Sequence, residues 1–149
     1  STLFPYTTLF RSERWVDGFV QSVGTAGSLR GNSEVLRARD ERIRIVAVEP
    51  AESPVLSGGP TGAHKIDGVG AGFVVPLWQP GLADHIELVS TAEADAMVLR
   101  LAREEGLFAG TSTGANAIAA LRLAERLGSG ATVVTVMVDT GMKYLARFR

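Results

Sequence analysis

The 149-residue sequence contains no cysteine and only two histidines, His64 and His85. The absence of cysteine excludes disulfides, thiolate metal sites and a cysteine nucleophile, and it makes a reducing cytoplasm the expected compartment. Two histidines are too few for a multi-histidine metal centre, so we expect no metal cofactor.

An excess of charge and a long hydrophobic run are also missing. The sequence has 15 Lys and Arg against 16 Asp and Glu, whereas a nucleic-acid-binding protein usually has a basic excess. No apolar run approaches the roughly 18 to 20 residues that are needed to span a bilayer. Hydrophobic residues make up 46% of the chain, which is enough for the core of one globular domain or of a large piece of one. We therefore expect neither nucleic acid nor a membrane as a partner.

Residues 1–12 have no periodicity that continues into the sequence after them. Residues 2–12 resemble the translation of a common sequencing adapter, so we predict that residues 1–12 are a non-native tail. The alternative is a native N-terminal tail. The remaining residues, 13–149, are expected to form the domain.

Short β-rich runs alternate with helical periods along this domain. Strands are predicted at residues 16–23, 43–48, 85–89 and 132–138, and helices between them at residues 29–39, 91–105 and 114–127. Ser90 lies three residues before Glu93, a spacing that is typical of the capping box at a helix start. The run at 132–138 is continuously apolar, as in strands buried on both faces of a parallel sheet. This alternation predicts an α/β fold with three αβα layers and a mainly parallel sheet.

Residues 24–28, with the sequence Gly-Thr-Ala-Gly-Ser, form a turn between a predicted strand and a predicted helix. Small residues let the main chain approach an anion closely, and amides at the start of a helix point toward it. The hydroxyls of Thr25 and Ser28 are further donors. Because the turn lacks both the lysine and the spacing of a nucleoside-triphosphate loop, it favours a phosphate monoester. The alternative is a glycine-rich turn with a serine cap.

A second glycine cluster, at residues 68–73, superficially resembles a dinucleotide-binding fingerprint. Phe73 stands where the third glycine belongs, a polar stretch replaces the preceding strand, and Pro76 follows in place of a helix. The context therefore argues against a dinucleotide site.

Five motifs, in order, resemble those of cysteine synthases and cystathionine β-synthases, which are fold-type-II enzymes that depend on pyridoxal phosphate (PLP). The motifs are residues 24–31, 46–59, 64–73, 104–115 and 139–145. The resemblance extends from about Val16 to Leu145, and five ordered motifs are far more specific than any one of them.

The resemblance implies PLP as the cofactor and a small amino acid as the substrate. It implies that the PLP phosphate is held by Gly24, Thr25, Ala26, Gly27 and Ser28. It also implies that the substrate side of the cofactor is lined by Gly68, Val69, Gly70 and Ala71. Ser112 would hydrogen-bond the pyridine nitrogen, and such a hydroxyl partner suits β-elimination and replacement. Ser112 is alternatively a plain helix N-cap.

The sequence departs from the family pattern in the turn and near the ring. Ala26 and Ser28 replace a glycine and a threonine, and both changes are conservative for phosphate binding. Asp139 and Thr140 replace a pair of serines near the ring, which leaves the choice of nucleophile open.

The family's Schiff-base lysine lies upstream of the phosphate loop, and the only lysines here, Lys65 and Lys143, lie outside its motif. The resemblance therefore implies the C-terminal half of a cysteine synthase, which makes cysteine from O-acetylserine and sulfide. The complete enzyme is expected to be a homodimer, and the isolated chain is expected to be inactive. The alternatives are cystathionine β-synthase or another PLP-dependent lyase, and a non-catalytic module that binds phosphate or PLP.

Overall fold

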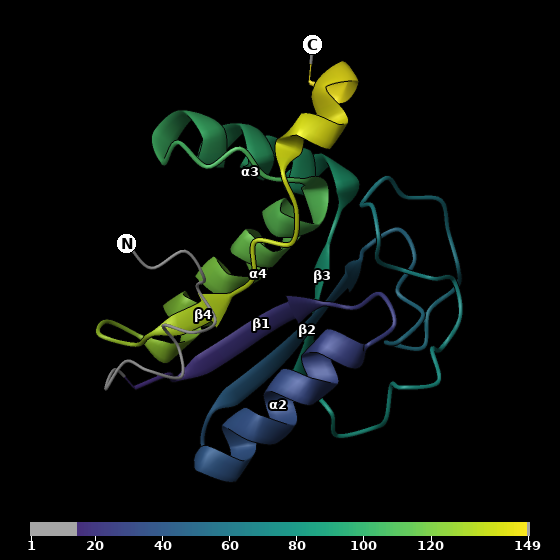
Figure 1. Ribbon diagram of the computed structural model, residues 1–149. Coiled ribbons are helices and arrows are strands. Elements are labelled where there is room, and N and C mark those ends of the chain that lie inside the picture. The colour runs from purple at the N-terminus through teal and green to yellow at the C-terminus, as the bar shows by residue number, and fades with distance from the viewer. Residues whose placement is uncertain (1–14, 149) are drawn as a thin grey trace.

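The computed structural model describes residues 15–148 of the chain, and the predicted non-native tail, residues 1–12, lies outside this range. A four-stranded sheet forms the centre of the fold (Figure 1). Its order is β3-β2-β1-β4, with all neighbouring strands parallel. The strands are β1 (Gly18–Ser22), β2 (Arg44–Pro50), β3 (His85–Val89) and β4 (Val133–Thr135). The predicted parallel α/β fold is confirmed.

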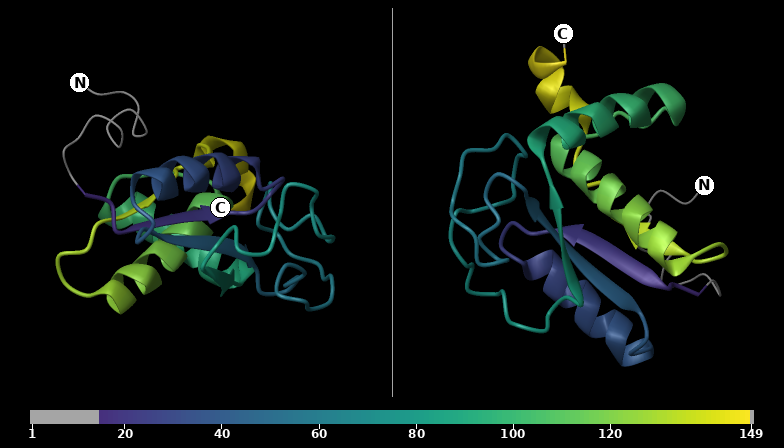
Figure 2. Two further views of the ribbon diagram at one scale, coloured as in Figure 1. Left: turned by 90° about the horizontal axis from the view of Figure 1, so that it is seen from below. Right: turned by 180° about the vertical axis from the view of Figure 1, so that it is seen from behind.

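Helices cover both faces of the sheet, which gives the three predicted layers (Figure 2). α2 (Gly27–Arg39) lies on one face, whereas α3 (Thr91–Glu104) and α4 (Thr111–Leu127) lie together on the other. A short 3-10 helix, η1 (Gly141–Arg147), follows β4. Within residues 15–148 no helix is both long and apolar enough to cross a membrane.

Two hydrophobic cores lie on the two faces of the sheet. Phe19 of β1 packs with Leu29 of α2 in one core, and its neighbour Val20 packs with Ala115 of α4 in the other. Successive side chains of a strand point to opposite faces, so β1 contributes to both cores. Burying a Val, Leu or Phe side chain stabilises the fold by roughly 1.5 to 3 kcal/mol.

The start of α3 confirms the predicted capping box. The Ser90 hydroxyl accepts a hydrogen bond from the Glu93 amide at 3.3 Å, and the Glu93 carboxylate accepts one from the Ser90 amide at 2.9 Å. The Ser90 hydroxyl also donates to the Glu93 carboxylate at 2.7 Å, and this bond, with the one from the Ser90 amide, lowers the pKa of Glu93. The capping box satisfies two amides that a helix leaves without main-chain partners, which fixes where α3 begins.

The last strand differs from its prediction. The apolar run at residues 132–138 predicted a long strand buried on both faces, but β4 has only three residues and they are half-buried. The physical reason is its place in the sheet: in the described part of the chain, β4 lies at an edge with β1 as its sole neighbour. After Thr135 the chain leaves the ladder, and Val138 is exposed. Apolar composition therefore overpredicted both the length and the burial of this strand.

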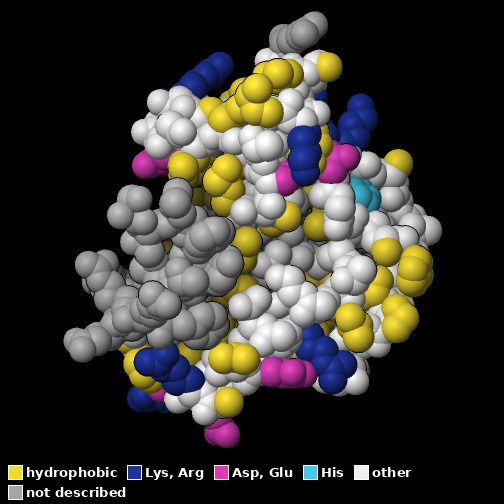
Figure 3. Space-filling model, in the orientation of Figure 1, with side chains coloured by type: hydrophobic (Ala, Val, Ile, Leu, Met, Phe, Trp, Pro, Cys, Tyr) yellow, Lys and Arg dark blue, Asp and Glu magenta, His cyan; other side chains and the backbone are white. Residues whose placement is uncertain are grey.

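The long connection between β2 and β3, residues 51–84, contains no helix or strand. Ile66 and Val75 are buried and anchor its inner side in the two cores. Its outer side exposes Phe73, Val74 and Leu77, and hydrophobic side chains gather at that edge of the molecule (Figure 3). The connection is thus a packed loop with an apolar outer surface.

Candidate functional site

The carboxyl ends of all four strands lie at one edge of the sheet, because every strand runs in the same direction. From β1 the chain crosses one face through α2 to reach β2, whereas it returns to the other side of β1 through α4 on the opposite face. Such a reversal opens a crevice beyond the strand ends, where ligands of open α/β sheets bind. Here the crevice lies beyond Ser22, the last residue of β1.

The turn after β1 presents main-chain donors to this crevice. Ala26 adopts the left-handed conformation, with φ at 68°, and α2 begins directly after it, at Gly27 and not at the predicted Leu29. Within the described part of the chain, the N-cap residue Ala26 makes no side-chain cap and the first turn of α2 holds no acid, while the Gly27 amide donates to the Thr25 hydroxyl at 3.4 Å. The amides that follow Gly27 and the positive end of the helix dipole are therefore available to an anion. The exposed side chains of Thr25 and Ser28 flank these amides.

One cavity of about 250 Å³ brings the predicted site residues together. Its lining includes the whole turn, the first part of the 68–71 loop and the start of α4: Gly24, Thr25, Ala26, Gly27, Ser28, Gly68, Val69 and Ser112. Ser112 lies in the first turn of α4 and is 5% exposed. The predicted phosphate turn and the predicted partner of the ring nitrogen therefore share a single space.

The other two residues of the predicted substrate-side loop have different positions. Ala71 lines a neighbouring cavity of about 440 Å³, which opens toward apolar Leu77. Gly70 acts through its main chain: its amide donates to the carbonyl oxygen of Val23 at 3.1 Å, and its φ is 63°. The loop is thus tied directly to the residue before the phosphate turn.

His64 stabilises the same loop through two hydrogen bonds within it. Its Nδ1 accepts a hydrogen bond from the amide of Ile66 at 3.3 Å, so its Nε2 carries the hydrogen and donates to the carbonyl oxygen of Gly70 at 3.0 Å. The imidazole therefore fixes the distance between the two ends of the segment 64–70.

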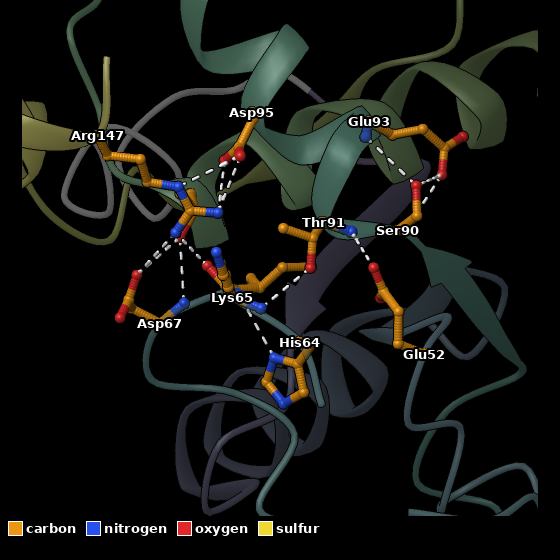
Figure 4. A network of polar contacts seen from close by, with 11 residues as sticks. Glu52, His64, Lys65, Asp67, Ser90, Thr91, Glu93, Asp95 and Arg147 are labelled. Carbon is orange, nitrogen blue, oxygen red and sulfur yellow. Dashed lines mark hydrogen bonds and ion pairs between the residues drawn. The ribbon is translucent and has the colours of Figure 1, made fainter. Parts of the chain in front are cut away.

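A network of polar contacts holds the 64–67 segment from outside (Figure 4). Arg147 of η1 bonds the Asp95 carboxylate of α3 through Nη2 at 2.9 Å and through Nε at 3.2 Å, and it donates to the carbonyl oxygen of Lys65. On the other side, the Asp67 amide donates a hydrogen bond to the Thr111 hydroxyl of α4 at 3.1 Å. The loop that lines the cavity is therefore clamped between α3, α4 and η1.

Glu52 extends this network toward β2. Its carboxylate accepts a hydrogen bond from the Thr91 amide at 2.7 Å, while the Thr91 hydroxyl accepts from the Lys65 amide at 3.0 Å. Burial raises the pKa of Glu52, but the bonds from Thr91 and from the Glu52 amide, together with the influence of His64, lower it overall. Glu52 thus stays ionised and supports the start of α3 where the loop passes.

Sequence reasoning missed two residues that shape the site, Arg147 and Asn116. Arg147 gives no sequence signal, because its partners lie 52 and 82 residues away. Asn116 gives a faint one: it is a fully buried amide in an otherwise apolar stretch of α4, one turn after Ser112. Buried polar side chains are rare unless they are hydrogen-bonded, so an isolated asparagine in such a helix indicates a specific partner.

Comparison with known proteins identifies this arrangement. The family model of pyridoxal-phosphate dependent enzymes matches residues 9–139. The chain belongs to this family. It is 46% identical to a cysteine synthase of Staphylococcus aureus over 131 residues, which cover 88% of the chain and 42% of the relative. The chain thus spans about two fifths of the length of the curated relatives it matches.

Solved structures of PLP-dependent enzymes share the fold. An O-acetylserine sulfhydrylase of Entamoeba histolytica is 40% identical, with a TM-score of 0.83 over 88% of the chain and 39% of that protein. An O-acetylserine dependent cystathionine β-synthase of Helicobacter pylori is 36% identical, with a TM-score of 0.83 over 88% of the chain and 42% of that protein. The predicted resemblance to cysteine synthases and cystathionine β-synthases is confirmed, as is the fold class.

The residues of the cavity fit the cofactor of the family. The uncapped start of α2 and two exposed hydroxyls suit a phosphate, and they lie in one cavity with the hydroxyl of Ser112, which suits a ring nitrogen. No acid in the first turn of α2 opposes the phosphate charge among the residues described. The donor set thus matches a small aromatic phosphate ester.

Proposed function

We propose that this chain is the cofactor-phosphate-binding part of a PLP-dependent β-replacement enzyme, namely a cysteine synthase that uses O-acetylserine and sulfide. The observation that carries the proposal is the single cavity that the phosphate turn shares with Ser112 at the strand ends. The 46% identity to a cysteine synthase supports the choice of reaction. Since the chain spans 42% of that relative, the activity belongs in this proposal to a longer, homodimeric and cytoplasmic enzyme.

In this proposal the turn at residues 24–28 holds the phosphate. The amides at the start of α2 and the hydroxyls of Thr25 and Ser28 donate to its oxygens, and the helix dipole adds to their attraction. The close packing of Gly68 and Val69 against the turn excludes water from one side of the cavity. The residues of this chain therefore supply anchoring and shielding.

Ser112 is assigned to the pyridine nitrogen. When bound, PLP supplies an electron-withdrawing ring that eases the loss of a proton and of a leaving group from an amino acid. A serine hydroxyl is not acidic enough to protonate the nitrogen, so Ser112 keeps this withdrawal moderate, whereas a carboxylate would strengthen it. Moderate withdrawal suits a reaction in which the β substituent departs directly.

Titration of the purified chain with PLP tests the proposal. We expect weak, non-covalent binding, because the remaining length of the relatives contributes the other wall of the site in this proposal. Pyridoxal without the phosphate should bind at least about tenfold more weakly, since it loses the charge-assisted bonds to the turn. Ser28→Ala should weaken PLP binding and leave pyridoxal binding unchanged. Equal affinity for PLP and pyridoxal would contradict the proposed site.

A non-catalytic PLP-binding module is the second candidate. The observation that favours it is that neither Lys65 nor Lys143, the two lysines of the sequence, lines the cavity at the phosphate turn. Both candidates expect no borohydride-trappable adduct at these lysines in the isolated chain. The gene distinguishes the two candidates: a lysine-bearing segment encoded in frame upstream of residues 1–12 supports the cysteine synthase, and a reading frame that starts near Glu13 supports the module. Cysteine formation by the isolated chain above the free-PLP background would contradict both.

A further inference from the structure

Asn116 joins the three segments that meet at the cavity. It lies on α4 and is fully buried. Its Oδ1 accepts a hydrogen bond from the main-chain amide of Ser22 at 2.7 Å, and its Nδ2 donates to the carbonyl oxygen of Val136 at 3.1 Å. One side chain thus binds the end of β1 and the exit of β4 at the same time.

These two main-chain groups need a side-chain partner because β1 and β4 separate there. The strands pair from Gly18 with Val133 to Val20 with Thr135, and the ladder ends at that point. Beyond it, the Ser22 amide and the Val136 oxygen lie outside the β1–β4 ladder, and both bind Asn116 instead. A buried main-chain group without a hydrogen bond costs about 1 to 3 kcal/mol, so Asn116 replaces the ladder where the crevice opens.

The position of this link matters for the site. Gly24, the first residue of the phosphate turn, follows Ser22 by two residues, and Val138, which follows Val136 by two, also lines the cavity. Ser112 precedes Asn116 by four residues, so both side chains lie on the same face of α4. The side chain of Asn116 therefore connects the phosphate turn to the helix turn that carries Ser112.

We propose that Asn116 is a positioning residue that sets the distance between the phosphate turn and Ser112, so that one PLP molecule contacts both. This inference rests on the proposed function. The link is short on both sides: only Val23 separates Ser22 from the turn, and one helical turn separates Asn116 from Ser112. Losing it frees the start of α4 to shift against the end of β1, which misplaces Ser112 while leaving the turn itself intact.

Comparing PLP, which contacts both the turn and Ser112 in this proposal, with a ligand that contacts only the turn distinguishes this role from a general loss of structure. In Asn116→Leu, which keeps the number and branching of the side-chain heavy atoms and removes both hydrogen bonds, we expect the dissociation constant for PLP to rise at least fivefold. Inorganic phosphate, measured by phosphorus NMR, contacts only the turn, and its dissociation constant should change less than twofold. If Asn116→Leu does not fold, Asn116→Ser, which has a smaller side chain and leaves room for a water, provides the same comparison.

A double-mutant cycle with Ser112→Ala tests the route of the effect. If Asn116 acts through Ser112, adding Asn116→Leu to Ser112→Ala should raise the PLP dissociation constant less than twofold. Thr135→Val is the matched control: it removes the bond from the Thr135 hydroxyl to the Val20 oxygen, 2.7 Å, which ties the same two strands without involving α4. The control should keep the wild-type PLP affinity within twofold.

The outcomes separate the two proposals. An equal loss of PLP and phosphate affinity in Asn116→Leu, or additive effects in the cycle, would overturn the positioning role. So would unchanged PLP affinity in that variant, and in each case the proposed function stands if the wild-type chain binds PLP. A wild-type chain that does not bind PLP would overturn the proposed function, and the role of Asn116 with it.

Discussion

The main-chain oxygen of Gly68 occupies the space that a side chain on Gly24 would need. A Cβ atom placed on Gly24 would come closer to this oxygen than the 3.0 Å that real Cβ atoms respect. Gly24 does not have a positive φ, so this contact, and not its backbone conformation, requires a glycine. The phosphate turn and the loop that covers it can pack together only because this residue has no side chain.

Gly24→Ala should therefore disrupt the site. The methyl group meets a main-chain oxygen, so one of the two loops must shift, and such overpacking costs roughly 1 to 3 kcal/mol of unfolding free energy. We also expect PLP affinity to fall at least about tenfold, a change of about 1.4 kcal/mol in binding free energy. Urea unfolding and PLP titration measure the two effects.

Gly31→Ala is the matched control for that substitution. Gly31 lies inside α2, and a Cβ placed on it meets nothing within 4 Å. Alanine is favoured over glycine in a helix interior by about 0.5 to 1 kcal/mol, so this variant should be more stable than the wild type. If Gly24→Ala behaved like Gly31→Ala, the close approach of the two loops would not be real.

Arg147→Met should loosen the loop that lines the cavity. The substitution keeps an apolar stem and removes the bonds to Asp95 and to the carbonyl oxygen of Lys65. For a partly exposed pair such as this, the loss of stability should be only about 1 kcal/mol. The local effect should be larger: amide hydrogen exchange across residues 65–70 should accelerate while exchange in β1 stays unchanged.

Arg100→Met provides the comparison, because Arg100 forms an exposed pair with Glu104 on the helix that carries Asp95. It should leave exchange in the loop at the wild-type rate. Equal exchange rates at residues 65–70 in Arg147→Met and in the wild type would mean that the clamp does not hold the loop.

Local patterns predicted the parts of the fold and site that depend on neighbouring residues. The spacing of Ser90 and Glu93 correctly located the start of α3, because both halves of a capping box lie within one turn. The small residues of the phosphate turn and the position of Ser112 were also readable, since each belongs to a short motif at the start of a helix. The turn follows β1, whereas Ser112 follows a short connection from α3, and the two helix starts line the same cavity.

The misses depend on residues far apart in the chain. Strand length at residues 132–138 was overpredicted because sheet order, which makes β4 an edge strand, is not written in its own sequence. The start of α2 was misjudged by two residues because Ala26 adopts a left-handed conformation that is uncommon for alanine. Asn116 was missed because its partner Ser22 is 94 residues away. The misses at β4 and Asn116 concern contacts that only the folded chain creates, and the miss at α2 concerns the backbone conformation of a single residue.

Glu87→Gln should remove part of the stability at neutral pH and little of it in acid. Glu87 of β3 is nearly buried between Arg122 and Arg126 of α4, at 3.1 and 2.9 Å. Burial alone raises the pKa of Glu87, but the bonds from Arg126 and Arg122 together outweigh it and bring the pKa below the ordinary value of 4.5. Because the folded-state pKa is the lower one, the stabilisation is present above pH 4.5 and is lost as the pH falls through the folded value.

We expect Glu87→Gln to lower the unfolding free energy by roughly 1 to 3 kcal/mol near pH 7, with the gap to the wild type narrowing in acid. Urea unfolding across the acid range measures this. Glu34→Gln removes an exposed carboxylate that pairs with Arg30 on α2, and it should change stability by less than about 0.5 kcal/mol near pH 7. A difference in unfolding free energy between Glu87→Gln and the wild type that does not vary with pH would contradict the ionic role of this carboxylate.

Tyr144 should ionise at an unusually high pH. Its hydroxyl donates a hydrogen bond to the Asp139 carboxylate at 2.6 Å. This bond, together with burial and the negative charge of Asp139, raises the pKa of Tyr144 from 10.0 to about 12. Since the folded-state pKa is raised, the stabilisation is complete below pH 10.0 and is lost as the pH rises toward about 12.

An ultraviolet titration of the phenolate measures this directly in Tyr6→Phe, which leaves Tyr144 as the remaining tyrosine of the sequence. Circular dichroism at each pH identifies the range in which the chain is folded. Asp139→Asn keeps a hydrogen-bond acceptor and removes the charge, so ionisation should move back toward 10.0. Ionisation of Tyr144 near 10.0 in the folded Tyr6→Phe chain would show that Asp139 does not hold the proton on the phenol.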